Sequence, residues 1–243
     1  MAQLQSLWIV RHGESAGNVL AYEAEAAGAE LIDVPDRDPD VALSPTGRAQ
    51  AEATARWFAA LPEAERPEVV VVSPYLRTRQ TAEPILAALG LPARRDERLR
   101  DRELGVLDRL TSHGVRARMP QEAQRRDRLG KFYYRPPGGE SWADVALRLR
   151  SLLGDLRRDH AGRRVLLVGH EALIFLLRYL LEELDEAALI ALTRREVVGN
   201  CSVSGWRCGP DGRFTGVLFN HIDHLREQGT AATSEEEIDA EPV

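Results

Sequence analysis

Cysteine and long apolar runs are scarce in this sequence, and each shortage narrows the class of protein. The 243 residues include two cysteines, Cys201 and Cys208, too few for a disulfide framework, so free thiols in a reducing compartment are expected. The longest apolar runs are broken by Arg or Glu before they reach membrane-spanning length. The amino terminus lacks the basic, apolar and small-residue order of a signal peptide. We therefore expect a cytoplasmic protein without a membrane partner.

The net charge of −6 is unevenly distributed along the chain. Residues 228–243 are acidic, rich in small residues and poor in core formers, which predicts a disordered tail after a domain of residues 1–227. The segment from Arg109 to Arg135 instead holds eight Arg or Lys residues against two acids. It has no interleaved aromatic platform and the whole chain is acidic, so a small anion is a better ligand for it than nucleic acid.

Apolar runs alternate with helical patterns along the 27.0 kDa chain. The expected strands cover residues 7–10, 69–72, 164–168, 202–207 and 214–220. The expected helices begin at Pro45, capped by Ser44, and cover residues 76–89, 141–158 and 172–181. This alternation predicts an α/β fold with a doubly wound, mostly parallel sheet flanked by helices. The turn "GPDGR" predicts an antiparallel hairpin at one edge.

Three of these strands run directly into arginine or histidine. Residues 7–10 continue into Arg11 and His12, the second strand leads to Arg77, and the third ends at His170. The carboxyl ends of parallel strands meet at one edge of a sheet, where ligands bind. Two arginines and two histidines there, with helix N-termini beside them, predict a pocket for an anion.

Phosphoryl transfer needs this set of side chains. A neutral imidazole can attack phosphorus and carry the phosphoryl group, fixed cations stabilise its oxygens, and a carboxylic acid protonates the leaving oxygen. Metal binding is the alternative use of paired histidines. Neither His12 nor His170 has a second ligand at metal spacing, and His221 and His224 are the weaker metal candidates. We expect no metal and no cofactor.

Four blocks, "RHGESAGN", "DVALSPTGRAQA", "SPYLRTRQTA" and "LLVGHEAL", resemble in order those of the histidine phosphatase superfamily, also called phosphoglycerate mutase-like. The resemblance covers residues 7–221 and implies a metal-independent phosphohistidine mechanism. It implies His12 as the nucleophile and Arg11, Arg77 and His170 as the phosphate pocket. Asn18 would contact the phosphate through its amide, and Ser15 is a further hydroxyl contact.

The segment that should supply the general acid departs from the family pattern, and two of its residues are candidates for that role. Relatives place Glu four residues before the glycine of this block, and that register falls on Asp101, with Gly105 as the glycine. Glu103 is the residue type that the family prefers. In an extended segment both point to the same side, and a flanking arginine could hold either one ionised. We predict Asp101 from the register alone.

Substrate contacts are predicted from the segment "GKFYYRPPGGESWADVALRLRSLL", which resembles fructose-2,6-bisphosphatases. That resemblance implies that Tyr133 and Arg135 bind the distal part of the substrate. The alternative is a turn at "PPGGES" with Ser141 capping the next helix. The inserted segment 109–137 is expected to form a lid over the pocket that selects substrates, the alternative being a solvated helix.

The predicted activity is hydrolysis of a small phosphorylated metabolite. Phosphoglycerate mutase-type transfer is a less favoured alternative, because a Leu-Lys-Asp-rich block of the mutases is replaced here by "ESWADVALRLR". A non-catalytic anion-binding module would have lost a pocket residue, yet both His and both Arg are present. The oligomeric state is left open, with a homodimer as one option.

Overall fold

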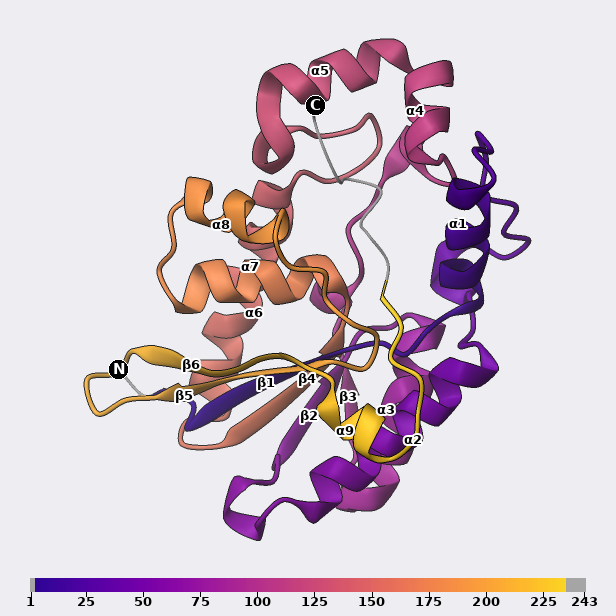
Figure 1. Cartoon of the computed structure of the whole chain (residues 1–243). Coiled ribbons are helices and arrows are strands. Elements are labelled where there is room, and N and C mark those ends of the chain that lie inside the picture. The colour runs from indigo at the N-terminus through magenta and orange to yellow at the C-terminus, as the bar shows by residue number, and fades with distance from the viewer. Residues whose placement is uncertain (1–2, 235–243) are drawn as a thin grey trace.

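The computed structural model describes residues 3–234 and has a six-stranded sheet with helices on both faces (Figure 1). The strands are β1 (Ser6–Arg11), β2 (Val69–Val72), β3 (Ala93–Arg95), β4 (Arg164–Gly169), β5 (Val203–Cys208) and β6 (Phe214–His221), in the order β3-β2-β4-β1-β5-β6. The first four are parallel, and β5 and β6 join β1 as an antiparallel pair. The doubly wound, mostly parallel sheet with an antiparallel edge is confirmed.

The α-helices of the described chain are α1 (Ala16–Ala26), α2 (Pro45–Ala60), α3 (Leu76–Leu89), α4 (Ser112–Arg118), α5 (Pro120–Tyr133), α6 (Trp142–Asp159), α7 (Glu171–Leu181), α8 (Glu186–Thr193) and α9 (Asp223–Glu227). Helices α2, α3, α6 and α7 were predicted from their apolar stripes and caps. Helix α1 escaped prediction because it buries no residue, and the wholly exposed β3 exists through pairing with β2. Between residues 3 and 234, no helix is long and apolar enough to cross a membrane.

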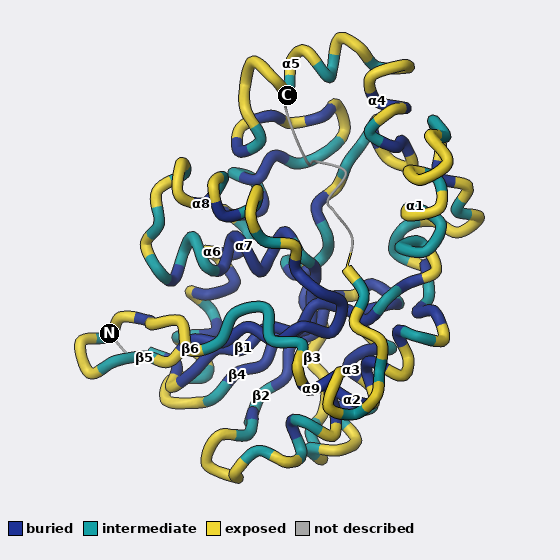
Figure 2. Tube along the Cα trace, in the orientation of Figure 1, coloured by how far each residue is buried: buried dark blue, intermediate teal, exposed yellow. Residues whose placement is uncertain are grey.

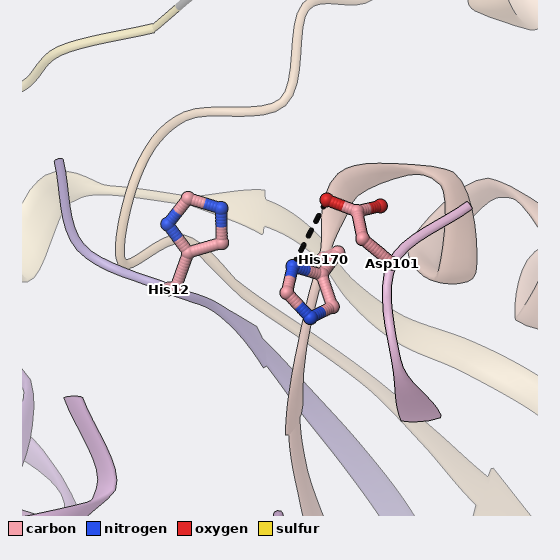
Figure 3. Close-up of side chains that lie close together, drawn as sticks. All are labelled: His12, Asp101 and His170. Carbon is pink, nitrogen blue, oxygen red and sulfur yellow. Dashed lines mark ion pairs between the residues drawn. The ribbon is translucent and has the colours of Figure 1, made fainter. Parts of the chain in front are cut away.

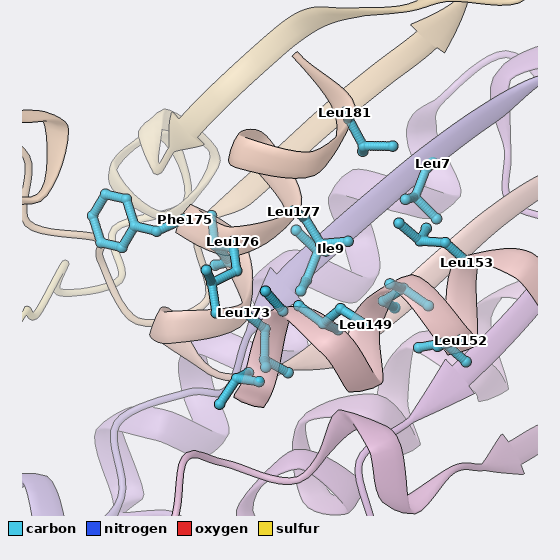
Figure 4. Close-up of a cluster of buried hydrophobic side chains, with 14 of the residues drawn as sticks. Leu7, Ile9, Leu149, Leu152, Leu153, Leu173, Phe175, Leu176, Leu177 and Leu181 are labelled. Carbon is cyan, nitrogen blue, oxygen red and sulfur yellow. The ribbon is translucent and has the colours of Figure 1, made fainter. Parts of the chain in front are cut away.

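The strand β1 is buried along its whole length because helices cover both of its faces. Leu7 and Ile9 belong to a core cluster with α6 and α7 (Figure 4). Trp8 and Val10 point to the opposite face, toward α2 and α3. Each fully buried side chain of this kind contributes about 1.5–3 kcal/mol. The buried strands therefore hold the loops at their carboxyl ends in place (Figure 2).

The carboxyl-terminal residues correct the predicted start of the tail. Gln228 donates from Nε2 to the carbonyl of Ala53 on α2, and Thr233 donates to Asn200. Gln50 donates to both Ala231 and Thr233. Residues 228–234 are thus bonded to the body of the protein, so the prediction started the tail too early. The rest of the predicted tail, 235–243, lies outside the described residues.

Candidate active site

The loops that follow β1 and β4 bring two histidines together. His12 follows the last residue of β1, and His170 caps the amino terminus of α7. Arg11 pairs in register with Gly169 across the two parallel strands. As a result, the buried imidazole rings of His12 and His170 lie 5.3 Å apart between centroids (Figure 3). The predicted meeting of these residues at one sheet edge is confirmed.

His12 is held as a neutral imidazole with one ring nitrogen turned away from the backbone. Its Nδ1 lies 2.8 Å from the carbonyl oxygen of Gly13, which can only accept, so Nδ1 carries the proton and Nε2 the lone pair. Burial, followed by the charge of Arg77, lowers the pKa of His12 well below its usual value. Such a ring is a nucleophile at neutral pH.

Gly13 allows the His12 loop to pack tightly against α2. A Cβ atom at this position would lie 2.6 Å from the carbonyl oxygen of Gly47, closer than any real contact of this kind. The Gly13 amide donates to Thr81 Oγ1 at 3.0 Å. The loop after β1 is therefore tied to the first turn of α2 and to the second turn of α3.

Both pocket arginines are buried and bound by acceptors. Arg11 Nη1 donates to the carbonyl of Val198 and lies 3.5 Å from Glu171 Oε2. Arg77 Nη1 donates to the carbonyl of Asp38 at 2.7 Å and to its Oδ1 at 2.8 Å. Arg77 Nη2 donates to Asp101 Oδ2 at 3.0 Å. Their guanidinium groups are thus fixed before any ligand binds.

Of the two candidate acids, Asp101 is the one that enters the cluster. Its Oδ2 lies 3.1 Å from His170 Nδ1 (Figure 3). The same oxygen lies 3.0 Å from Arg77 Nη2. Burial raises the pKa of Asp101, but His170 and Arg77 outweigh it and hold this pKa well below its usual value. Glu103 is exposed and accepts the Tyr75 hydroxyl at 3.2 Å. Asp101 therefore occupies the position that the register predicts for the acid.

Two residues next to Arg77 were missed by the sequence reasoning. Ser73 Oγ lies 2.9 Å from His170 Nε2, which orients the ring so that Nδ1 faces Asp101. The Tyr75 ring lies 5.1 Å from the His170 ring, and Arg77 Cζ lies 4.8 Å from the Tyr75 centroid. The sequence signal that could have identified them was their place in the block "SPYLRTRQTA".

Ser15 and Asn18 both take part in the cap of α1. Ser15 Oγ accepts the Asn18 amide at 3.1 Å, and Asn18 Oδ1 accepts the Ser15 amide at 2.7 Å. Asn200 donates to the His12 carbonyl at 3.3 Å and to Asn18 Oδ1 at 3.5 Å, which ties this cap to the cluster. The side-chain oxygen of Asn18 accepts hydrogen bonds from within the protein. The side-chain nitrogen of Asn18 is therefore the atom that can donate to a phosphate.

Tyr133 and Arg135 are engaged away from the cluster. The Tyr133 hydroxyl, on a 56% exposed side chain, donates to Glu186 of α8. Arg135 pairs with Asp144, the residue that completes the capping box of Ser141 at the start of α6. The capping alternative for this segment is therefore present in the structure, and the substrate contacts predicted for Tyr133 and Arg135 stay a prediction.

The inserted segment 109–137 forms helices α4 and α5, which stand apart from the sheet and near α1 (Figure 1). Its basic residues meet the acid-rich segment 23–40. Arg118 pairs with Glu30 at 2.6 Å, and Arg109 donates to the carbonyl of Asp36 at 2.8 Å. Beneath the helices lies a cavity of about 450 Å³, lined by Val106, Arg118, Met119, Pro120, Gln121, Glu122 and Pro137. The role of this segment as a lid stays a prediction.

His12, Asp101 and His170 could also supply a metal with three ligand atoms, which lie within 4.8 Å of one another. The neighbouring charges argue against a resident cation. Arg77 Nη2 already occupies the Asp101 oxygen that faces His170, and a divalent ion there would be repelled by this fixed guanidinium. The donor set therefore fits an anion better than a metal.

His221 and His224, the weaker metal candidates, stack with ring centroids 5.3 Å apart. His224 Nε2 lies 3.0 Å from Thr54 Oγ1, and burial lowers the pKa of His224 to about 4. Both rings pack near Trp57. This pair is explained by the packing of the end of β6 and of α9 against α2.

Known proteins resemble this chain in sequence and fold. The family model described as "Histidine phosphatase superfamily (branch 1)" matches residues 7–221. Phosphoglycerate mutase-like protein AT74H of Arabidopsis thaliana is 28% identical and covers 91% of this chain and 80% of its own. The 6-phosphofructo-2-kinase/fructose-2,6-bisphosphatase of Gallus gallus is 31% identical over 75% of this chain, which spans 34% of that protein. A mycobacterial glucosyl-3-phosphoglycerate phosphatase has a TM-score of 0.71 and 29% identity, covering 90% of this chain and 99% of its own.

Proposed function

Because the chain belongs to the histidine phosphatase superfamily and is a phosphoric monoester hydrolase of that family, we propose that it hydrolyses a small phosphorylated metabolite without a metal. The reaction passes through a phosphohistidine on His12. The observation that carries this proposal is the pairing of a neutral buried His12 with an Arg77–Asp101–His170 cluster beside it. The same pocket supplies a nucleophile, fixed cations and a carboxyl group.

In the first step, His12 Nε2 attacks phosphorus and the ester P–O bond breaks. Arg11, Arg77 and His170 stabilise the charge on the phosphoryl oxygens, with the Asn18 amide and the Ser15 hydroxyl as further contacts. Asp101 in its acid form protonates the leaving alkoxide. In the second step, Asp101 removes a proton from water, the hydroxide attacks the phosphohistidine, and phosphate leaves as the His12 imidazole is restored.

Asp101 must be protonated for the first step, although its pKa is low in the free enzyme. Arg77 and His170 are the cause of that low pKa. A bound phosphate takes up the charge of the same cations, so the pKa of Asp101 rises when the substrate binds. A monoanionic phosphate ester can bring the proton with it. Glu103, held by Tyr75, is the alternative acid.

One assay separates this function from its alternatives. The protein is incubated with p-nitrophenyl phosphate or 3-phosphoglycerate in the presence of EDTA, and the quenched enzyme is tested for acid-labile phosphate. Release of phosphate with EDTA present is expected. Conversion of 3-phosphoglycerate to 2-phosphoglycerate would support a mutase, and no reaction on these or a wider metabolite panel would indicate an anion-binding module.

A further inference from the structure

The pocket carries positive charge on two arginines, where the phosphoryl group would bind. Negative charge on carboxylates lies beside them, on the side of Asp101. Both terminal nitrogens of Arg77 already hold carboxylates, Asp38 on Nη1 and Asp101 on Nη2. Arg11 in turn faces Glu171 at 3.5 Å. The two guanidinium groups suffice for one phosphoryl group, and the carboxylates beside them oppose a second anion.

Asp38 shares the Arg77 guanidinium with Asp101. Asp101 is the proposed proton donor to the leaving alcohol, and Asp38 is held by the other nitrogen of the same guanidinium. The Asp38 side chain is 45% exposed, so a ligand can reach it, whereas Arg77 is 6% exposed. Asp38, which is 39 residues from Arg77 in sequence, thus places a hydrogen-bond acceptor at the mouth of the pocket.

Another carboxylate is linked to Arg77 through Tyr75. Glu103 accepts the hydroxyl of Tyr75, whose ring packs on both His170 and Arg77. Burial and the charge of Asp38 raise the pKa of Asp108. Arg109, the cation beside Asp108, donates to the carbonyl of Asp36. Asp38 and Asp101 on Arg77, and Glu103 on Tyr75, therefore add negative charge beside the proposed proton donor.

We propose that Asp38 is a specificity-determining residue that selects phosphate monoesters of alcohols bearing hydroxyl or ammonium donors and no second anionic group. This inference rests on the proposed function. Asp38 accepts hydrogen bonds from the donors of the leaving alcohol, and its charge repels a carboxylate or second phosphate at that place. The names of two relatives, a fructose-2,6-bisphosphatase and a glucosyl-3-phosphoglycerate phosphatase, indicate doubly anionic substrates, so this chain would differ from them in specificity.

The test compares glycerol 3-phosphate with 3-phosphoglycerate, which differ by a hydroxymethyl group in place of a carboxylate. O-phosphoethanolamine is the test compound whose alcohol carries an ammonium group. Kd by calorimetry and kcat/KM are measured for the wild type, Asp38→Asn and Asp38→Glu. Asp40→Asn is the matched control, because Asp40 lies on the same short turn and pairs with Arg37. Thermal melting verifies that each variant is folded.

The wild type is expected to favour glycerol 3-phosphate over 3-phosphoglycerate by about tenfold or more. Asp38→Asn should reduce this ratio about fivefold or more by improving 3-phosphoglycerate, while Asp38→Glu and Asp40→Asn retain it. Equal or tighter binding of 3-phosphoglycerate by the wild type, or an equal loss on both compounds in Asp38→Asn, would overturn the inference. Calorimetry needs no turnover, so a failure of the proposed function, seen as no phosphate release, is distinguished from a failure here.

Discussion

The sheet edge and the inserted segment 109–137 carry charge in two different ways. At the sheet edge, Arg11, His12, Arg77 and His170 are buried, and their backbones are held by strand register and core packing. In the inserted segment, Arg118 and Arg125 are about half exposed and form ion pairs with neighbouring acids, each worth about 0–1 kcal/mol. Chemistry that needs fixed distances lies on the first region, and changes in the second should be tolerated.

Replacing His12 by alanine should have the largest effect. We expect kcat/KM for p-nitrophenyl phosphate to fall by a factor on the order of 10³ or more, because the other imidazole of the cluster, His170, has its ring nitrogens facing Ser73 and Asp101. Acid-labile phosphoenzyme should disappear while the thermal midpoint changes by only a few degrees. More than a few per cent of wild-type turnover would remove His12 as the nucleophile.

Arg77→Ala should follow, with a loss of roughly 10²–10³ in kcat. The missing guanidinium leaves charge on the transferring group uncompensated, and it also frees Asp38 and Asp101. Stopped-flow or steady-state assays of kcat/KM provide the measurement. Wild-type values would show that the sheet edge is no more important than the exposed segment.

The acid is identified by comparing Asp101→Asn with Glu103→Gln on an alkyl phosphate and on p-nitrophenyl phosphate. Loss of the true acid should cost about 10²-fold on the alkyl ester and far less on p-nitrophenyl phosphate, whose leaving group needs little protonation. We expect this pattern for Asp101→Asn. If Glu103→Gln alone shows it, the exposed acid acts in catalysis.

Arg77→Gln should also raise the pKa of His12. Arg77 is, after burial, the next cause of the low pKa of His12, so removing its charge makes protonation easier. The His12 ring should therefore titrate at a higher pH in the variant, which NMR of the Cε1–H signal measures, with His12→Ala used for assignment. An unchanged titration would mean that burial alone sets the pKa.

The smallest effects are expected from charge reversals in the inserted segment, at Arg116, Arg118, Arg125 and Arg126. Long-range steering of anions is weak and screened by salt. We expect KM for 3-phosphoglycerate to rise only about threefold more than KM for p-nitrophenyl phosphate. Equal changes for both substrates would indicate a solvated face and no lid.

Much of the fold follows from local patterns. The apolar runs of β1, β2 and β4 and the capped stripes of α2, α3, α6 and α7 were predicted because burial imposes a regular spacing on side chains. Helix α1, strand β3 and helix α8 have little such spacing. The partners that Tyr133 and Arg135 have within the protein, Glu186 of α8 and Asp144 of α6, could not be predicted, because they lie on other helices.

The sequence by itself determined that Arg11, His12, Arg77 and His170 share one edge, because strand ends in a parallel sheet have a common direction. Only the tertiary structure brought Asp101 to His170 and left Glu103 exposed at Tyr75, although an extended chain would point both to the same side. It also decided the place of Asp38, which no local signal connects to Arg77. Such contacts depend on how irregular segments cross the sheet edge, and that path is set by packing over the whole molecule.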